Sequence, residues 1–492
     1  MDATGQLCNC FWSDAKCRMD YGFFGDVLVF DTTFETNEYD KPFAPFVGVN
    51  NHGQTTLFRC ALLLDESTYS FVWLFKTFLN AMNGKHTQTI FTDQAAPIMN
   101  AIKQVFPNTH HRLCLWHIFQ LAAKHLSHIF ARSEFFAMDF KRCIYENGTE
   151  EEFDLMWKSL LKKYKLTNNK WLKILYKKKE KWAQVYGRLH FCAGMTTTQR
   201  SEGMNSFLKK YFKRTLSLKS FVIQYDKVLT CRRDIEKAQN FRSTQKKPPL
   251  QSHWPLEARA SELYTTTMFA HFQKEYTQTL DLIPELVDQD GPVYTYKVTS
   301  FKFSCARIIT FNSLDNFIQC SCKHFQFMGM ICSHSIKILH THQVYDLLSQ
   351  YYLSRWTVDA KNGVGIEEPK KNGAGIQGNS GSSSLEYSDL ARMALSLAVK
   401  GTSTGTSSAF TKKLLTGVLG ELDNFLKSTQ DDQAEKIINV ADENNENMGQ
   451  TSIQLPMSQT SIQLPMSANI TLRAPPRSKK SSKKTGRIKS SV

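Results

Sequence analysis

The chain has 492 residues, of which 41% are hydrophobic and 12% aromatic, so it is long enough to form several domains with packed cores. No apolar run approaches the ~20 residues of a membrane-spanning helix, and the polar first twenty residues predict no signal peptide. We therefore expect the 12 cysteines to be reduced thiols or metal ligands rather than a disulfide framework. The formal net charge is +16, half of it from eight Lys and Arg residues after Leu472, where Asp and Glu are absent. So basic a chain favours a partner such as nucleic acid.

Strand-like and helical runs alternate in the first part of the chain. Apolar residues between 71 and 82 recur at helical spacing and predict an amphipathic helix, and Pro97 suits the first turn of a second helix. Strands are predicted at 26–31, 42–50, 55–64, 89–93 and 111–116. Three strands, a helix, a strand, a helix and a strand is the order of a ribonuclease-H-like α/β fold.

Two of the predicted strands end on a carboxylate, Asp31 and Asp93. Neighbouring strands would bring these side chains together, and close carboxylates repel unless a divalent cation such as Mg²⁺ or Mn²⁺ neutralises them. A third acid, Glu202, lies in a stretch with helical spacing that includes Asn205, Lys209 and Phe212. The alternative is that the aspartates only cap turns at the strand ends.

A dense cysteine and histidine cluster follows predicted strands at 293–298 and 306–311. Cys320, Cys322, Cys332 and His334 form a C-x-C-x9-C-x-H pattern, and three thiolates with one imidazole suit tetrahedral Zn²⁺. A helix is predicted after the last ligands, over 333–339, and His324 is interpreted as a solvated turn residue rather than a ligand. The pattern resembles the SWIM zinc finger, which binds DNA or protein.

Several motifs together resemble the Mutator-like (MULE) transposase domain, and more narrowly the plant far-red-impaired-response and far-red-elongated-hypocotyl family. They begin with the segment FWSDAKCRMDYGFFGDVLVFDTTFETNEYDKPFAPFVGVNNHGQTTLFRCALLLDES and continue through FTDQAAPIMNAIKQVFPNTHHRLCLWH, WLKILYKKKEKWAQVY, FCAGMTTTQRSEGMNSF and CSCKHFQFMGMICSHSIKIL. The resemblance covers about residues 10–357. It implies that Asp31, Asp93 and Glu202 match the three catalytic metal-binding acids, and that Cys114 and His117 match a C-x-x-H element. It also implies nuclear, transposase-derived transcription regulators that bind promoters, some of them in light signalling.

The resemblance also divides the chain into domains. Full-length members carry an N-terminal DNA-binding finger, and since this chain starts too late to include it, we expect a shortened member. The predicted parts are a first part of the ribonuclease-H-like domain at 1–125, a helical insertion at 126–195, the remainder of that domain with a helical connector at 196–285, the SWIM module at 286–357, a flexible linker at 358–384, a weak helical segment at 385–428 and a disordered tail at 429–492.

Two further features have open interpretations. Cys114 and His117 are either part of a second metal site or a structural pair on a strand. The lysines of the insertion either follow DNA phosphates or form a solvated helix face, opposite an apolar side of Trp157, Leu160, Leu161, Tyr164, Trp171, Ile174, Leu175 and Trp182. The basic tail is interpreted as a nuclear localisation signal made of Arg477, Lys479, Lys480, Lys483, Lys484, Arg487 and Lys489.

Three functions fit these features. The first is a zinc-binding, transposase-derived nuclear regulator of transcription without enzymatic turnover, acting on DNA directly or through a partner. The second is an active DDE transposase, which the retained acids favour. The third is a shortened protein that forms oligomers with full-length relatives and titrates them. The sequence predicts no membrane partner.

Overall fold

The computed structural model describes residues 8–33, 36–245, 247–301, 306–361, 397, 401, 406–418 and 420–421. The chain forms two compact units, Met1–Arg392 and Met393–Val492. In the second unit residues 406–418 are helical, and most of the predicted segment 385–428 around them lies outside the described residues. Most of the predicted linker and the whole predicted tail, with its localisation signal, lie outside the described residues.

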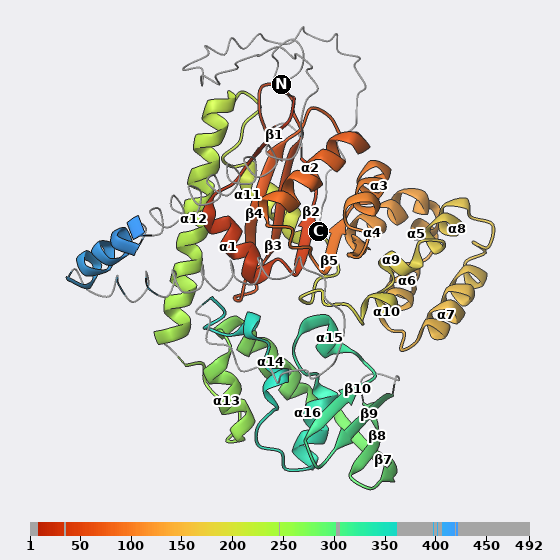
Figure 1. Ribbon diagram of the computed structural model, residues 1–492. Helices are drawn as coiled ribbons and strands as arrows, with labels where there is room; N and C mark the ends of the chain where they lie inside the picture. Colours follow the sequence, from red (N-terminus) through yellow and green to blue (C-terminus); the bar gives the residue numbers. More distant parts are fainter. Residues whose placement is uncertain are drawn as a thin grey trace, which may run out of the picture. The chain divides into compact units, whose positions relative to one another are not determined.

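A six-stranded mixed sheet forms the first part of the first unit (Figure 1). The strand order is β1-β4-β3-β2-β5-β6, in which β2, β5 and β6 run parallel and the remaining pairs are antiparallel. This arrangement confirms the ribonuclease-H-like fold predicted from the element order. The strands are β1 (Cys10–Trp12), β2 (Val27–Phe30), β3 (Phe43–Val49), β4 (Thr55–Leu62), β5 (Thr89–Thr92) and β6 (His110–Leu113).

Alternate residues of the central strands enter two different cores, because successive side chains of a strand point to opposite faces. Leu28 and Phe30 of β2 pack with the helices α2 (Thr68–Ala81) and α3 (Ala96–Val105). Val27 and Val29 pack on the other face, with α11 (Gln199–Leu208) and α12 (Leu218–Gln245). All four strand residues are fully buried, so the sheet is covered on both faces, as expected for its near-continuous apolar strands.

The insertion is an all-helical cluster with its own core, seen beside the sheet in Figure 1. Trp157, Leu160, Leu175 and Trp182 are buried there as predicted, but Ile174 is 57% exposed, so the predicted apolar side was wrong at that position. The cluster's core includes α4, which begins before residue 126. Its helices are α4 (Leu115–His125), α5 (Ser127–Arg132), α6 (Phe136–Tyr145), α7 (Glu150–Lys163), α8 (Lys170–Tyr176), α9 (Lys179–Trp182) and α10 (Gln184–Gly187).

A second sheet, of strand order β10-β9-β8-β7, carries the cysteine-rich segment. The predicted strands and helix are present as β8, β9 and α16, with Ile336 and Leu339 buried, while β7 and β10 were not predicted. The elements from the connector onward are α13 (Pro255–Leu263), α14 (Thr266–Gln278), β7 (Leu282–Asp290), β8 (Val293–Ser300), β9 (Arg307–Asn312), β10 (Phe317–Cys320), α15 (His324–Met328) and α16 (Ser333–Thr341).

The segment after α16 joins the zinc-finger region to the transposase-like sheet. Arg355 forms an ion pair with Asp26, the residue before β2, although the two are 329 residues apart. The Trp356 side chain is buried, and its Nε1 donates to the Met328 carbonyl at 2.9 Å. Lys361 pairs with Asp20 at 2.6 Å and with Glu236 of α12. These buried contacts fix the far end of the zinc-finger region against the sheet.

The structure also corrects the sequence interpretation at several boundaries. Strand β6 ends at Leu113, so Cys114 and His117 do not lie on a strand but at the start of α4. Helix α11 ends at Leu208, so Lys209 and Phe212, which were predicted on the helix that carries Glu202, lie beyond its end. Neither β1 nor α1 (Ala15–Phe24) was predicted from the sequence. Among the described helices, no long apolar stretch matches the requirements of a membrane span.

Candidate functional site

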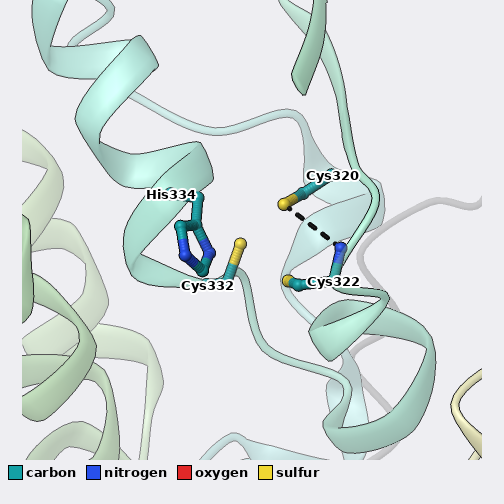
Figure 2. A group of neighbouring side chains, drawn as sticks. All are labelled: Cys320, Cys322, Cys332 and His334. Atoms are coloured by element: carbon teal, nitrogen blue, oxygen red, sulfur yellow. Dashed lines mark hydrogen bonds between the residues drawn. The ribbon is translucent and has the colours of Figure 1, made fainter. Parts of the chain in front are cut away.

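The three cysteines and the histidine predicted as zinc ligands converge in the structure (Figure 2). Cys320 ends β10, Cys322 lies in the following turn, and Cys332 and His334 stand at the start of α16. Their ligand atoms all lie within 4.8 Å of one another. A tetrahedral zinc ion with Zn–S bonds of ~2.3 Å needs ligand atoms roughly 3.8 Å apart, so the four side chains fit Zn²⁺ with small adjustments.

Backbone geometry shapes the loop between the two ligand pairs. Lys323 and Gly329 both have positive φ angles, 56° and 79°, which turn the chain before and after α15. A Cβ atom at Gly329 would lie 2.4 Å from the Leu353 side chain, so only glycine allows this close approach. Cys332 then caps α16, since its sulfur accepts a hydrogen bond from the Ser335 amide at 3.4 Å. The loop is therefore closed tightly enough to hold four ligands together.

The electrostatics of the cluster keep its thiols protonated until a cation takes the place of the protons. The contact with Cys320 raises the pKa of the Cys322 thiol to about 12, and burial raises that of Cys332 well above its ordinary value. Three adjacent thiols thus resist losing their protons unless a positive ion replaces them. Burial lowers the pKa of His334 to about 4, with a further contribution from Arg307, so its imidazole is neutral at pH 7 and able to ligate. A closed site of four protein ligands is structural rather than catalytic.

His324 is not the solvated turn residue that the sequence suggested. It begins α15, and its Nε2 lies 3.9 Å from a carboxylate oxygen of Glu275 on α14. The other oxygen of Glu275 accepts the backbone N–H of Ser333, beside a zinc ligand, at 2.8 Å. Glu275 therefore supports the metal loop from outside, and no local pattern in the sequence indicated this role.

Asp31 and Asp93 follow the ends of two adjacent strands. Val27, Leu28 and Val29 of β2 pair in parallel with residues 89–91 of β5, so the same register places both aspartates at one edge of the sheet. Asp93 accepts the Ala95 amide at 3.1 Å ahead of α3, which is also the capping role considered as the alternative. Beside Asp31, the Thr32 hydroxyl donates to Glu66, an acid that the sequence analysis did not consider.

The backbone before α11 is tied to the neighbouring strand end. The Cys114 sulfur accepts two hydrogen bonds from Thr198. The backbone amide donates at 3.2 Å and the side-chain hydroxyl at 3.0 Å. Thr198 directly precedes α11, the helix that carries Glu202, so these bonds position the start of that helix. Burial would raise the pKa of the Cys114 thiol, but hydrogen bonds from His117 and Thr198 outweigh it and hold the pKa below its ordinary value.

The lysines of the insertion are not uniformly free to contact a partner. Lys179 pairs with Asp154 and Lys163 with Asp139, each at 2.6 Å. The sequence also did not predict that Arg112 of β6 would be buried, with its guanidinium donating to backbone carbonyls that include those of Trp182 at 3.0 Å and Ala183 at 3.1 Å. Arg112 therefore joins the sheet to the insertion, and part of the basic face has a structural role.

Comparison with known families gives one match for the sheet region and one for the cysteine and histidine cluster. The model of the MULE transposase domain matches residues 27–121, and the model of the SWIM zinc finger matches residues 309–343. The chain is 34% identical over 364 residues to FAR1-RELATED SEQUENCE 9 of Arabidopsis thaliana. This match covers 74% of this chain and 67% of that protein. The chain belongs to the FAR1-related family.

Other members of the FAR1-related family are longer. The chain is 40% identical over 357 residues to FAR1-RELATED SEQUENCE 5 and 38% identical over 359 residues to FAR-RED IMPAIRED RESPONSE 1, both of Arabidopsis thaliana. These matches cover 72% and 73% of this chain but only 45% and 43% of the relatives. The chain thus spans less than half the length of these two relatives. The cluster of three cysteines and one histidine lies within the residues that the SWIM model matches.

Proposed function

We propose that the protein is a transposase-derived nuclear regulator of transcription that acts without enzymatic turnover. The observation that carries this proposal is the occurrence of a MULE core and a SWIM zinc finger in one chain of the FAR1-related family. One relative is named for a far-red response, which supports a role in light-responsive development. Its partners are promoter or chromatin DNA, reached directly or through related family members with which it forms oligomers.

Charge and rigidity support binding to nucleic acid. The net charge of +16 attracts phosphates at long range, and the basic C-terminal residues would also direct the chain to the nucleus. The zinc ion would hold the loop of the SWIM finger in one conformation, and Arg355 and Trp356 anchor that finger to the sheet. Four protein ligands would leave the zinc ion no open position for chemistry, so the finger suits binding.

The second candidate is an active DDE transposase, and the edge position of Asp31 and Asp93 favours it. With Glu202 on α11, these acids would hold divalent cations such as Mg²⁺ or Mn²⁺, which polarise a phosphodiester for attack by water and then by a 3′-hydroxyl. The bonds between Cys114 and Thr198 would keep the helix with Glu202 at the same strand ends. A third candidate is a protein that forms oligomers with related family members and titrates them.

A paired assay separates the first two candidates. The wild type is compared with the Asp31→Asn, Asp93→Asn, Glu202→Gln triple variant, first in a nuclear reporter assay and then for DNA cleavage with Mg²⁺ or Mn²⁺. The regulator proposal predicts equal reporter activity for both proteins and no metal-dependent cleavage by either. Cleavage by the wild type that the triple variant loses would establish the transposase instead.

A further inference from the structure

A pocket of about 350 Å³ lies where five parts of the first unit meet, and neither the zinc ligands nor the acidic sheet edge line it. It is bordered by the β3–β4 turn, the end of the insertion, helices α11 and α14, and the loop around α15. This volume is within the range of small-molecule binding sites, and too large to be a packing defect. The side chains that give it its charge are Arg200, His271, Lys274, Glu275 and His324.

The pocket has an excess of positive charge. Arg200 is half-buried, and one of its N–H groups donates to the carbonyl of Gly53. Within the described part of the chain, neither Arg200 nor Lys274 forms an ion pair with a carboxylate. The single acid, Glu275, already accepts the Ser333 amide beside the zinc loop. Two cations therefore face one carboxylate that is engaged elsewhere.

Partial burial makes the charge of Arg200 costly, whereas Lys274 stays exposed to solvent. Burial lowers the pKa of Arg200, and the nearby charge of Arg355 lowers it further. The His271 side chain is exposed, and its pKa is lowered by partial desolvation, with the charges of Lys274 and Arg200 adding to the effect. His271 is therefore neutral at pH 7 and has one N–H to donate. A cation without a counter-charge in a partly desolvated site is stabilised by an anion that enters.

Two glycines keep the walls of the pocket in place. Gly53 and Gly194 have φ angles of +67° and +72°, a conformation that other residues rarely adopt. A Cβ atom at Gly194 would lie 2.5 Å from the sulfur of Met328, and one at Gly53 would lie 3.1 Å from Met268. The turns that carry these glycines thus pack directly on the pocket's methionines. The walls are held in position by backbone, so the space is part of the fold.

We propose that this pocket binds a phosphate group, held by Arg200 and Lys274 with an N–H of His271. A guanidinium offers a fork of donors that matches phosphate oxygens, and the ammonium adds a second charge. The phosphate belongs either to a DNA backbone or to a small soluble phosphate compound. The inference goes beyond the proposed regulatory function, because it would hold for either kind of ligand whether or not the protein controls transcription.

The test uses the full chain and two probes, inorganic pyrophosphate and a fluorescent 20-base-pair duplex. The variants are Lys274→Gln, at an exposed position that tolerates substitution, and Arg200→Gln. The control is Lys76→Gln, which removes the same charge from the exposed face of α2, outside the pocket. Thermal melting measures pyrophosphate binding, and fluorescence anisotropy at several salt concentrations measures duplex binding.

If the ligand is a small soluble phosphate compound, we expect pyrophosphate to raise the melting temperature of the wild type and of Lys76→Gln. The two pocket variants, Lys274→Gln and Arg200→Gln, should show no such rise. If the ligand is a DNA phosphate, we expect no such rise. The slope of log affinity for the duplex against log salt concentration should then be smaller in magnitude by about one for Lys274→Gln than for Lys76→Gln. The proposal is overturned if both pocket variants behave like Lys76→Gln with both probes. That result would leave the regulatory proposal intact, since reporter activity is measured separately.

Discussion

Replacing Cys332 by serine tests the zinc site with little disturbance of its surroundings. Cys332 has two roles, since it is one of four clustered ligands and its sulfur also caps α16 at Ser335. Serine is among the best N-cap residues, so Cys332→Ser keeps the cap and removes only the thiolate. The change therefore isolates the contribution of one metal ligand.

The size of the effect follows from the ligand set. Structural zinc sites bind with about 10–16 kcal/mol at pH 7, so one of four ligands accounts for roughly 3 kcal/mol. A loss of that size weakens zinc binding by about 100-fold, because each ~1.4 kcal/mol is a factor of ten. Competition against a chromophoric zinc chelator measures the affinity, and melting with and without a strong chelator measures the coupled stability.

The matched control is Cys231→Ser, which removes a half-buried thiol of α12 far from the ligand cluster in sequence. We expect Cys231→Ser to bind zinc with wild-type affinity and to melt at a lower temperature when the chelator is present. Cys332→Ser should show no such effect of the chelator. Equal zinc affinity for Cys332→Ser and the wild type would refute the assignment of Cys332 as a ligand.

Three other predictions concern the scaffold. Trp356→Ala should destabilise the protein by about 3–5 kcal/mol, measured by denaturant unfolding, because it opens a cavity and leaves the Met328 carbonyl without its donor; a change below 1 kcal/mol would contradict this anchor. Burial lowers the pKa of His111 to about 3, with Lys181 adding to the effect, so the unfolded state takes up a proton below about pH 6.5 while the folded state does not, and stability falls as pH drops from 6.5 toward 3. Between pH 7 and 5 the wild type should lose about 2 kcal/mol of unfolding free energy through His111, and His111→Gln should abolish this part of the loss. The exposed-site control His128→Gln should lose as much as the wild type, measured by melting at several pH values. Cys114→Ala should increase hydrogen exchange at the start of α11 without changing zinc content, and unchanged exchange there would show that its bonds do not position that helix.

Local patterns predicted those parts of the fold that local chemistry determines. The apolar spacing of α2 was sufficient because Phe71, Leu74, Phe75 and Phe78 face one core, all buried. The spacing of the four ligands also sufficed, since both ligand pairs flank a single short loop. The order of strands and helices indicated the ribonuclease-H-like sheet.

The elements that were missed depend on distant partners. Strand β1 has three residues and exists because it pairs with β4, some 50 residues later in the chain. The ion pair of Arg355 with Asp26 and the pairs of Lys361 with Asp20 and Glu236 join residues that no sequence window contains together. The charged pocket was missed for the same reason, because its residues come from separate elements.

Genome-wide chromatin occupancy of the tagged protein tests the central claim most directly, when it is compared with the Asp31→Asn, Asp93→Asn, Glu202→Gln variant. The account predicts discrete promoter peaks that both proteins share, because the acids would serve no turnover in a regulator. Occupancy confined to inverted-repeat ends, with DNA breaks that the variant loses, would contradict it. Absence of occupancy for both proteins would also contradict it and would favour the protein that titrates its relatives.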